Sequence, residues 1–257
     1  MKAIWLALAL AASPAFAFRP GGIPVVDASV TGYGAAVLAE STGLVAFWPL
    51  YEASGTNADE VVSGYDATYS AGATLGRPSL VIDGEAMSAS LLTGNTGAAV
   101  KAFQAELSVI GDTTGTLAFW MYINKSASTV LSGLYSIDDG SGADRFVVYS
   151  SGAPDVSVYT GAGTNVMSSG LSAKTAYWIV VRWNGTQLDI FANNASIYSN
   201  TTWVAPTGST AANIQLGHLV IAGSNEPGYT GDRMQGVAYW NVAVSDAKLT
   251  AIWNASQ

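Results

Sequence analysis

Residues 177–191 of the chain read YWIVVRWNGTQLDIF, and this stretch decides the fold. Residues 177–183 are almost wholly apolar and rich in β-branched and aromatic side chains, which is typical of a strand buried on both faces. Residues 187–191 partly alternate polar with apolar side chains, as in a strand buried on one face. Asn184 and Gly185 stand between them and tolerate positive φ, so the stretch predicts a β-hairpin with a tight turn at this dipeptide.

The composition of all 257 residues agrees with one large all-β domain. Hydrophobic residues make up 49% of the chain and charged residues 11%, so the chain is able to bury a sizeable core. The formal net charge is −8, with 10 Lys and Arg residues in total, which argues against nucleic acid as a partner because phosphate binding needs clustered cations. The chain contains no Cys, which excludes disulfides and thiolate metal sites.

Residues 1–17 have the three-part pattern of a secretory signal peptide. Lys2 is positively charged, residues 3–12 are apolar, and residues 15–17 read AFA, a small-x-small cleavage pattern. We expect cleavage after residue 17 and a secreted or extracellular protein. We expect no membrane insertion of the mature domain, since the apolar run is shorter than the ~20 residues of a membrane span. The alternative is a retained hydrophobic N-terminal segment.

Residues 18–42 contain several Gly and Pro residues and few large side chains, which predicts an arm or linker ahead of a folded domain at residues 43–257. One interpretation is a flexible tether, because extended N-terminal segments are often poorly ordered. The other is an arm that docks on a neighbouring subunit of a homo-oligomer.

Residues 43–56 read GLVAFWPLYEASGT, and Asp59 and a Ser-Gly pair follow. This opening resembles the laminin-G-like, concanavalin-A-like jelly-roll domains. Residues 116–123 (TLAFWMYI), the hairpin at 177–191 and a closing segment at 231–245 are similar to later parts of that family, in the same order. The resemblance implies a jelly-roll β-sandwich of two antiparallel sheets with a short C-terminal helix. Consecutive strands are expected at residues 130–137, 145–150 and 155–160. Ser245 is the expected N-cap of a helix that closes one end of the sandwich.

Two catalytic patterns are missing from the chain. Glucanases that share this architecture carry Glu-x-Asp-x-(x)-Glu on one strand, because alternate residues face the same way and place two carboxyl groups beside the scissile bond. None of the six Glu residues begins such a motif. His218 is the one histidine and lacks an accompanying Gly-x-Ser-x-Gly turn, so it is interpreted as a polar strand residue. These observations predict that the protein is not an enzyme, with a glycoside hydrolase as the third-ranked alternative.

Calcium is the metal ion that the pattern allows. Asp59 stands where the family often has an acidic residue near a calcium site, and the acidic loop at residues 138–144 offers oxygen ligands. Relatives often carry acidic residues in the closing strand, where this chain has Met234-Gln235-Gly236. The same loop is also typical of an ordinary hairpin connection.

The ligand surface is expected on loops at an end or edge of the sandwich, because loops present side chains to solvent from a rigid scaffold. Four of the eight Trp residues lie inside apolar strands and are predicted core residues: Trp48, Trp120, Trp178 and Trp183. The candidates for ligand binding are Asp138, Asp144, Trp203, Tyr229 and Asp232.

The sequence therefore predicts an exported recognition module that binds a glycan or a cell surface. The alternative is a structural component of an extracellular assembly or a virion, such as a decoration, fibre or adhesion protein of a bacterial virus, with a particle protein as its partner and the virion surface as its location.

Overall fold

The computed structural model describes most of the chain from residue 32 onward. The described residues are 32–64, 66–69, 73–81, 87–90, 113–124, 131–138, 145–151, 155–160, 163–165, 170–203, 213–216, 219–221, 224–226 and 233–257. The expected signal peptide at residues 1–17 and residues 18–31 of the expected arm lie outside them. Cleavage after residue 17 therefore stays a prediction.

The larger sheet of the described structure has eight strands, all paired antiparallel. Its order is β13-β12-β11-β6-β17-β5-β4, and β1 pairs with β17 beside this path. The strands are β1 (Leu44–Trp48), β4 (Thr74–Pro78), β5 (Met87–Ser90), β6 (Thr114–Tyr122), β11 (Ala176–Asn184), β12 (Gln187–Ala192), β13 (Ala195–Asn200) and β17 (Arg233–Trp240).

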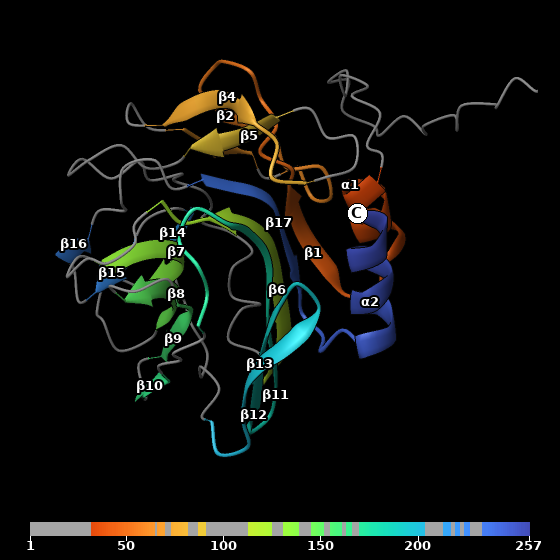
Figure 1. The fold of residues 1–257 in the computed structure, drawn as a ribbon, viewed down its shortest axis with the longest axis vertical. Coiled ribbons are helices and arrows are strands. Elements are labelled where there is room, and N and C mark those ends of the chain that lie inside the picture. Colours follow the sequence, from red (N-terminus) through yellow and green to blue (C-terminus); the bar gives the residue numbers. More distant parts are fainter. Residues whose placement is uncertain are drawn as a thin grey trace, which may run out of the picture.

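The smaller sheet lies opposite the larger one (Figure 1) and has the order β10-β9-β8-β7-β14. Its strands are β7 (Leu131–Asp138), β8 (Arg145–Ser151), β9 (Ser157–Thr160), β10 (Gly163–Asn165) and β14 (Asn213–Leu216). Two short hairpins complete the described strands: β2 (Asn57–Ala58) with β3 (Ala67–Thr68), and β15 (Leu219–Ile221) with β16 (Ser224–Glu226). The predicted β-sandwich of two antiparallel sheets is confirmed.

The predicted hairpin at residues 177–191 is confirmed as β11 and β12, with one shift at its turn. Asn184 pairs with Gln187, so the two central residues are Gly185 and Thr186, one position later than predicted. Gly185 has φ 59°, the conformation that a glycine at the first central position of a short hairpin turn supplies without steric cost.

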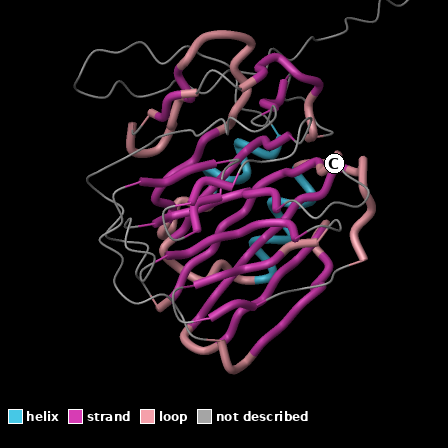
Figure 2. Tube along the Cα trace, turned by 90° about the vertical axis from the view of Figure 1, so that its left-hand side faces the viewer, coloured by secondary structure: helices cyan, strands magenta, loops and turns pink. Residues whose placement is uncertain are grey.

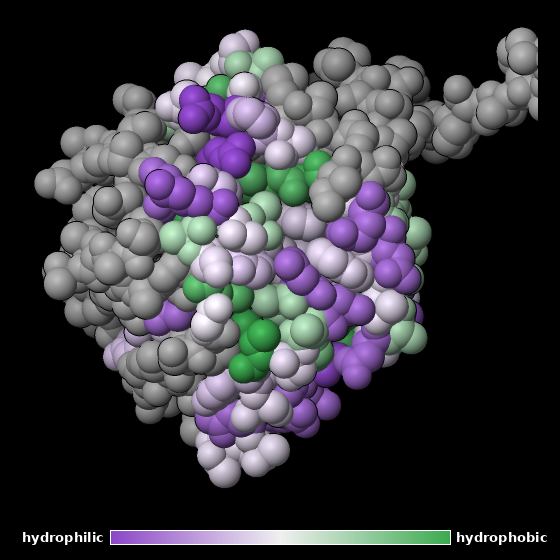
Figure 3. Space-filling view, viewed as in Figure 1, coloured by the Kyte–Doolittle hydropathy of each residue, from purple (hydrophilic) through white to green (hydrophobic). Residues whose placement is uncertain are grey.

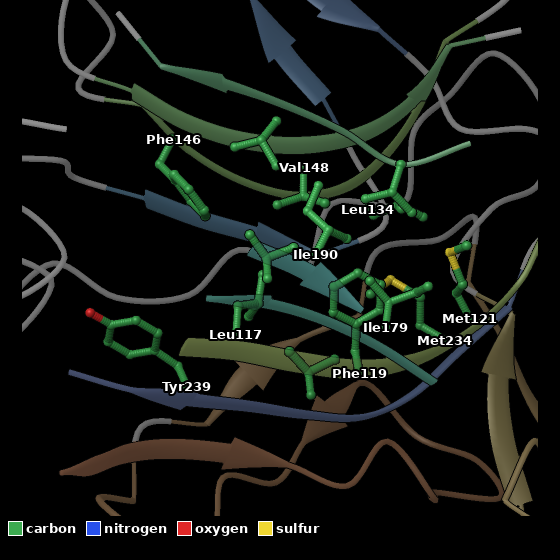
Figure 4. Packing of buried hydrophobic residues seen from close by; sticks show 14 of the residues in the cluster. Leu117, Phe119, Met121, Leu134, Phe146, Val148, Ile179, Ile190, Met234 and Tyr239 are labelled. Carbon is green, nitrogen blue, oxygen red and sulfur yellow. The ribbon is translucent and has the colours of Figure 1, made fainter. Parts of the chain in front are cut away.

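The space between the sheets is filled by alternate residues of β6 and β11. Leu117, Phe119 and Met121 face the smaller sheet together with Ile179 and Val181, and none is more than 1% exposed. Phe146 and Val148 of the smaller sheet meet them from the other side (Figure 4). Because successive side chains of a strand point to opposite faces, the residues between these positions must be covered on the outer face.

Two helices provide that cover: α1 (Gly32–Ala39) and α2 (Asp246–Ala255) pack on the face of the larger sheet that points away from the smaller one (Figure 1). The same helices lie behind the strands in Figure 2. Within the described part of the chain, no helix is long and apolar enough to span a membrane. The molecule is therefore layered as helices, larger sheet and smaller sheet.

Two expectations about these helices are wrong. Residues 32–39 fall inside the predicted arm at 18–42, yet Tyr33 and Val37 of α1 are fully buried, so packed structure begins before residue 43. The C-terminal helix covers a face of the sandwich and does not close an end. The reason is that the predicted core residues Trp120 and Trp178 point outward, where Trp253 of α2 stacks on them at centroid distances of 5.7 and 5.9 Å.

Tyr33 joins α1 to the sheet through its ring and its hydroxyl. The hydroxyl donates to the Gly236 carbonyl at 2.9 Å and accepts from Trp178 Nε1 at 3.3 Å. Gly236 has φ 60°, and a Cβ atom there would lie 2.4 Å from Tyr33 Cε1. Gly236 therefore serves two needs at once, a left-handed backbone and room for the tyrosine ring.

We expect Gly236→Ala to lower the free energy of unfolding by about 2 kcal/mol more than Gly185→Ala, because overpacking a core costs about 1–3 kcal/mol. Both glycines have nearly equal φ, 60° and 59°, so backbone strain is shared, whereas a Cβ at Gly185 would meet nothing within 4 Å. Chemical denaturation of the two variants measures the difference. Equal losses would contradict the packing of Tyr33 on Gly236.

Candidate functional site

Most residues predicted to bind a ligand lie beyond the described structure. Asp144, Tyr229 and Asp232 belong to segments outside the described residues. Asp138 ends β7, where its backbone pairs with Arg145 and Asn213, and its side chain is likewise outside the description. Their proposed contacts with a ligand stay predictions.

Trp203 is not exposed, contrary to the expectation. Its side chain is 1% exposed, and its ring packs edge to face on Trp183 with centroids 6.3 Å apart. The backbone N–H of Trp203 donates to the Thr186 carbonyl at 2.8 Å, which holds this residue at the β11–β12 turn. The Thr- and Pro-rich flanks indicate a loop, but a large apolar ring in a loop gains free energy by entering a neighbouring core.

The side chain of Glu60 is buried and binds backbone N–H groups of the loop beside the β2–β3 hairpin. This carboxylate is 5% exposed and accepts from the Phe47 N–H at 2.8 Å, the Val62 N–H at 2.8 Å and the Gly64 N–H at 2.7 Å. The Ser63 N–H donates to it as well. These hydrogen bonds satisfy the buried carboxylate and fix the geometry of the loop.

A tyrosine and a glutamate form the inner polar pair of this region. The Tyr69 hydroxyl donates to Glu52 Oε2 at 2.6 Å, and the Asp59 N–H donates to Glu52 Oε1 at 2.9 Å. Burial raises the pKa of Glu52 although both hydrogen bonds favour its charged form. Burial and the neighbouring Glu52 charge raise the pKa of Tyr69 far above its usual range, so Tyr69 acts as a hydrogen-bond donor.

Three exposed side chains, those of Asn57, Asp59 and Asp66, lie next to this pair. Asn57 Nδ2 donates to Asp59 Oδ1 and, at 3.1 Å, to Asp66 Oδ2. Asp66 Oδ1 accepts from the Glu60 N–H at 3.0 Å, which connects the set to the buried carboxylate. Within the described structure, Asn57 Oδ1 and Asp59 Oδ2 have no donor and face solvent as preset acceptors.

Asp59 was the predicted calcium ligand. Among the described residues no three His, Cys, Asp or Glu side chains are grouped to hold a metal ion. Asp59 lies beside Asn57 and Asp66, and its backbone contacts Glu52. Calcium binding at Asp59 stays a prediction.

Arginines and a tyrosine form a second group nearby, on β4, β6 and β17. Arg233, the first residue of β17, lies over the Tyr122 ring with its guanidinium carbon 4.5 Å from the centroid. Its Nη1 donates to the Pro78 carbonyl at 2.8 Å, beside the exposed Arg77. Burial lowers the pKa of Arg233, and the charge of Arg77 lowers it further. The Gly76 N–H bonds to the Glu52 carbonyl at 3.2 Å, which joins β4 to the first group.

These two groups define what we call the β4 end of the sandwich, where β2 and β4 lie together (Figure 1) and hydrophilic side chains gather over them (Figure 3). Its residues are Glu52, Asn57, Asp59, Asp66, Tyr69, Arg77, Tyr122 and Arg233. Sequence reasoning identified Asp59 alone. A signal was present for Arg233, because the chain has few arginines and this one directly follows the candidate Asp232.

No protein-family model matches the chain, and a search of curated proteins finds no match. Solved structures match it at low identity. The Trypanosoma rangeli sialidase in complex with the inhibitor DANA has a TM-score of 0.59 and 13% identity, over 82% of this chain and 33% of its own. The same sialidase in complex with sialic acid has a TM-score of 0.56 and 15% identity, over 82% and 32%. The W1252A mutant of HCR D/C VPI 5995 has a TM-score of 0.57 and 12% identity, over 84% and 52%.

The chain thus spans about a third of the length of the sialidase, and the likeness shows a shared β-sandwich fold. It also contradicts the prediction that the protein is not an enzyme, because enzymes are among the structures with this fold. That prediction relied on a missing pair of carboxylates, whereas sialidases use a tyrosine nucleophile and do not follow the two-carboxylate rule. The absence of Glu-x-Asp therefore excludes one mechanism and not catalysis as such.

The pH dependence of stability tests the buried position of Glu52. A carboxyl whose pKa is raised on folding stabilises the fold below its ordinary pKa of 4.5, and this contribution is lost as the pH rises through the raised value. Glu52→Gln removes the titration. We expect the stability of the variant relative to wild type to increase over the pH interval above 4.5, measured by chemical denaturation. A relative stability that is constant or falls over this interval would disprove the burial of the charge.

Proposed function

We propose that the protein binds carbohydrate through the β4 end. The observation that carries this proposal is the Asn57, Asp59 and Asp66 cluster, which offers exposed oxygen acceptors in a geometry set by Asn57 and by the Glu60 N–H. Sugar hydroxyls are donors and acceptors at close spacing, so they suit a site with fixed carboxylate and amide groups. Solved structures with this fold support the proposal, since one of them holds sialic acid.

Preorganisation is the physical reason to favour this region over a strand face. Binding is weakened by every side chain that must be ordered, and these three side chains are held before a ligand arrives. The large aromatic side chains Trp120 and Trp178 are buried under the helices and Trp183 between the sheets, so none is free to stack on a sugar. We therefore assign the ligand contacts among the described residues to the polar side chains at the end of the sandwich.

Export remains part of the proposal and relies on the N-terminal pattern of residues 1–17. A secreted protein with this site would act on a glycan outside the cell. The alternative, a component of an extracellular assembly or virion, makes a different prediction in the same experiment.

A glycan array probed with the full chain tests the proposal, followed by titration of the best ligand. We expect Asn57→Ala and Asp59→Ala to weaken binding about tenfold or more, because each removes a charged or amide contact. Asn184→Ala is the matched control, since Asn184 is exposed at the β11–β12 turn at the opposite end of the sandwich (Figure 1). Melting curves confirm that each variant is folded.

Glycan binding that survives both changes would overturn the placement at the β4 end. Absence of binding to every glycan, together with tight association with a filament or capsid, would move the function to assembly.

A further inference from the structure

Arg77 and Arg233 are the cations of the β4 end, and no described carboxylate neutralises them. The ion pairs among the described residues involve Arg182 and Lys248, each with acidic partners. Arg77 is exposed, and Arg233 is half-buried against Tyr122. The chain has a net charge of −8, and yet neither of these two arginines forms an ion pair with a described carboxylate.

The sheet places both arginines at the same end. β5 lies between β4 and β17, with Arg77 paired to Ser88 and Met234 paired to the next residue, Ala89. Arg233 precedes Met234 and reaches back to the Pro78 carbonyl, next to Arg77. The two charges thus face one region of the β4 end.

Donors remain available in this region. A guanidinium carries five N–H groups in a planar fork, and Arg233 uses one of them on Pro78. The Tyr122 ring fixes the guanidinium plane from one side, which lowers the entropy lost when a ligand binds. The Tyr122 hydroxyl has no hydrogen bond within the described part of the chain. A planar anion between the arginines would accept from both and relieve their mutual repulsion.

We infer that Arg77 and Arg233 bind a carboxylate group of an acidic sugar, with the Tyr122 hydroxyl as a further contact. This inference rests on the proposed carbohydrate binding and specifies its ligand class. The planar fork of a guanidinium matches the two oxygens of a carboxylate, so each arginine is able to bind this group through two hydrogen bonds. The net charge of −8 repels anions at long range, so recognition depends on these short contacts.

The test compares oligosaccharides of uronic acids and sialic acid with the same molecules after reduction of their carboxyl groups to alcohols. We expect wild type to bind the acidic forms about tenfold more tightly than the reduced forms. Arg77→Gln should abolish this preference, so that the acidic and the reduced forms bind with equal affinity. Arg233→Gln should act in the same direction, and the preference of wild type should fall as NaCl is raised.

Lys248→Gln is the control, because it removes the same charge from α2, where Lys248 pairs with Glu40. Arg77 is exposed and its side chain has no described hydrogen bond, so Arg77→Gln should melt like wild type and give a clear result. Equal affinity for acidic and reduced forms, or an acidic preference that survives Arg77→Gln, would overturn the inference while carbohydrate binding stands. Preference for sulfated over carboxylated sugars would also overturn it. Binding of none of these molecules or of any arrayed glycan would overturn the proposed function itself.

Discussion

Strands β6 and β11 must be covered on both faces, and the rest of the structure depends on this constraint. Leu117, Phe119 and Met121 need an apolar partner on one side, and Ala118 and Trp120 need one on the other. A second sheet satisfies the first requirement. The two helices satisfy the second, with Tyr33 joined to Gly236 and Trp178 by its hydroxyl. A sandwich of two sheets alone would leave Trp120 and Trp178 in water, at a cost of roughly 2–3 kcal/mol for each large apolar side chain.

The same constraint decides where function can lie. Aromatic side chains that cover both faces of a sheet are unavailable to a ligand, so the faces of the larger sheet serve stability. The side chains at the ends of the sandwich are not needed to cover these faces. At the β4 end, two carboxylates hold the loop in place: the buried Glu60 through backbone N–H groups and the half-buried Glu52 through Tyr69. The exposed Asn57, Asp59 and Asp66 are positioned by this internal frame.

Some arginines of the described structure bind carboxylates of the same chain, and others do not. Arg182 binds Asp189 and Asp246 and the Val244 carbonyl, which fixes the start of α2 on the sheet. The N–H groups of Arg182 that make these contacts stabilise the fold. Arg77 and Arg233 lie on the same sheet but retain donors toward solvent. The presence or absence of a paired carboxylate, more than the overall charge of −8, indicates which arginines would bind an anionic group.

Local sequence pattern predicted the hairpin at residues 177–191, the consecutive strands at residues 130–137, 145–150 and 155–160, and the burial of Trp48, Trp120, Trp178 and Trp183, because alternation and apolar runs are local properties of a strand. It did not determine which face each tryptophan occupies, since a strand that is apolar on both faces has no distinguishing period. It also did not reveal α1, whose eight residues are too few to form a helix without the sheet beneath them. Trp203 looked exposed because its neighbours are those of a loop, and only the packing on Trp183 decided otherwise. The β4 end combines Asn57 and Asp66 with Arg77 and Arg233, and strand pairing between distant segments is what brings such residues together.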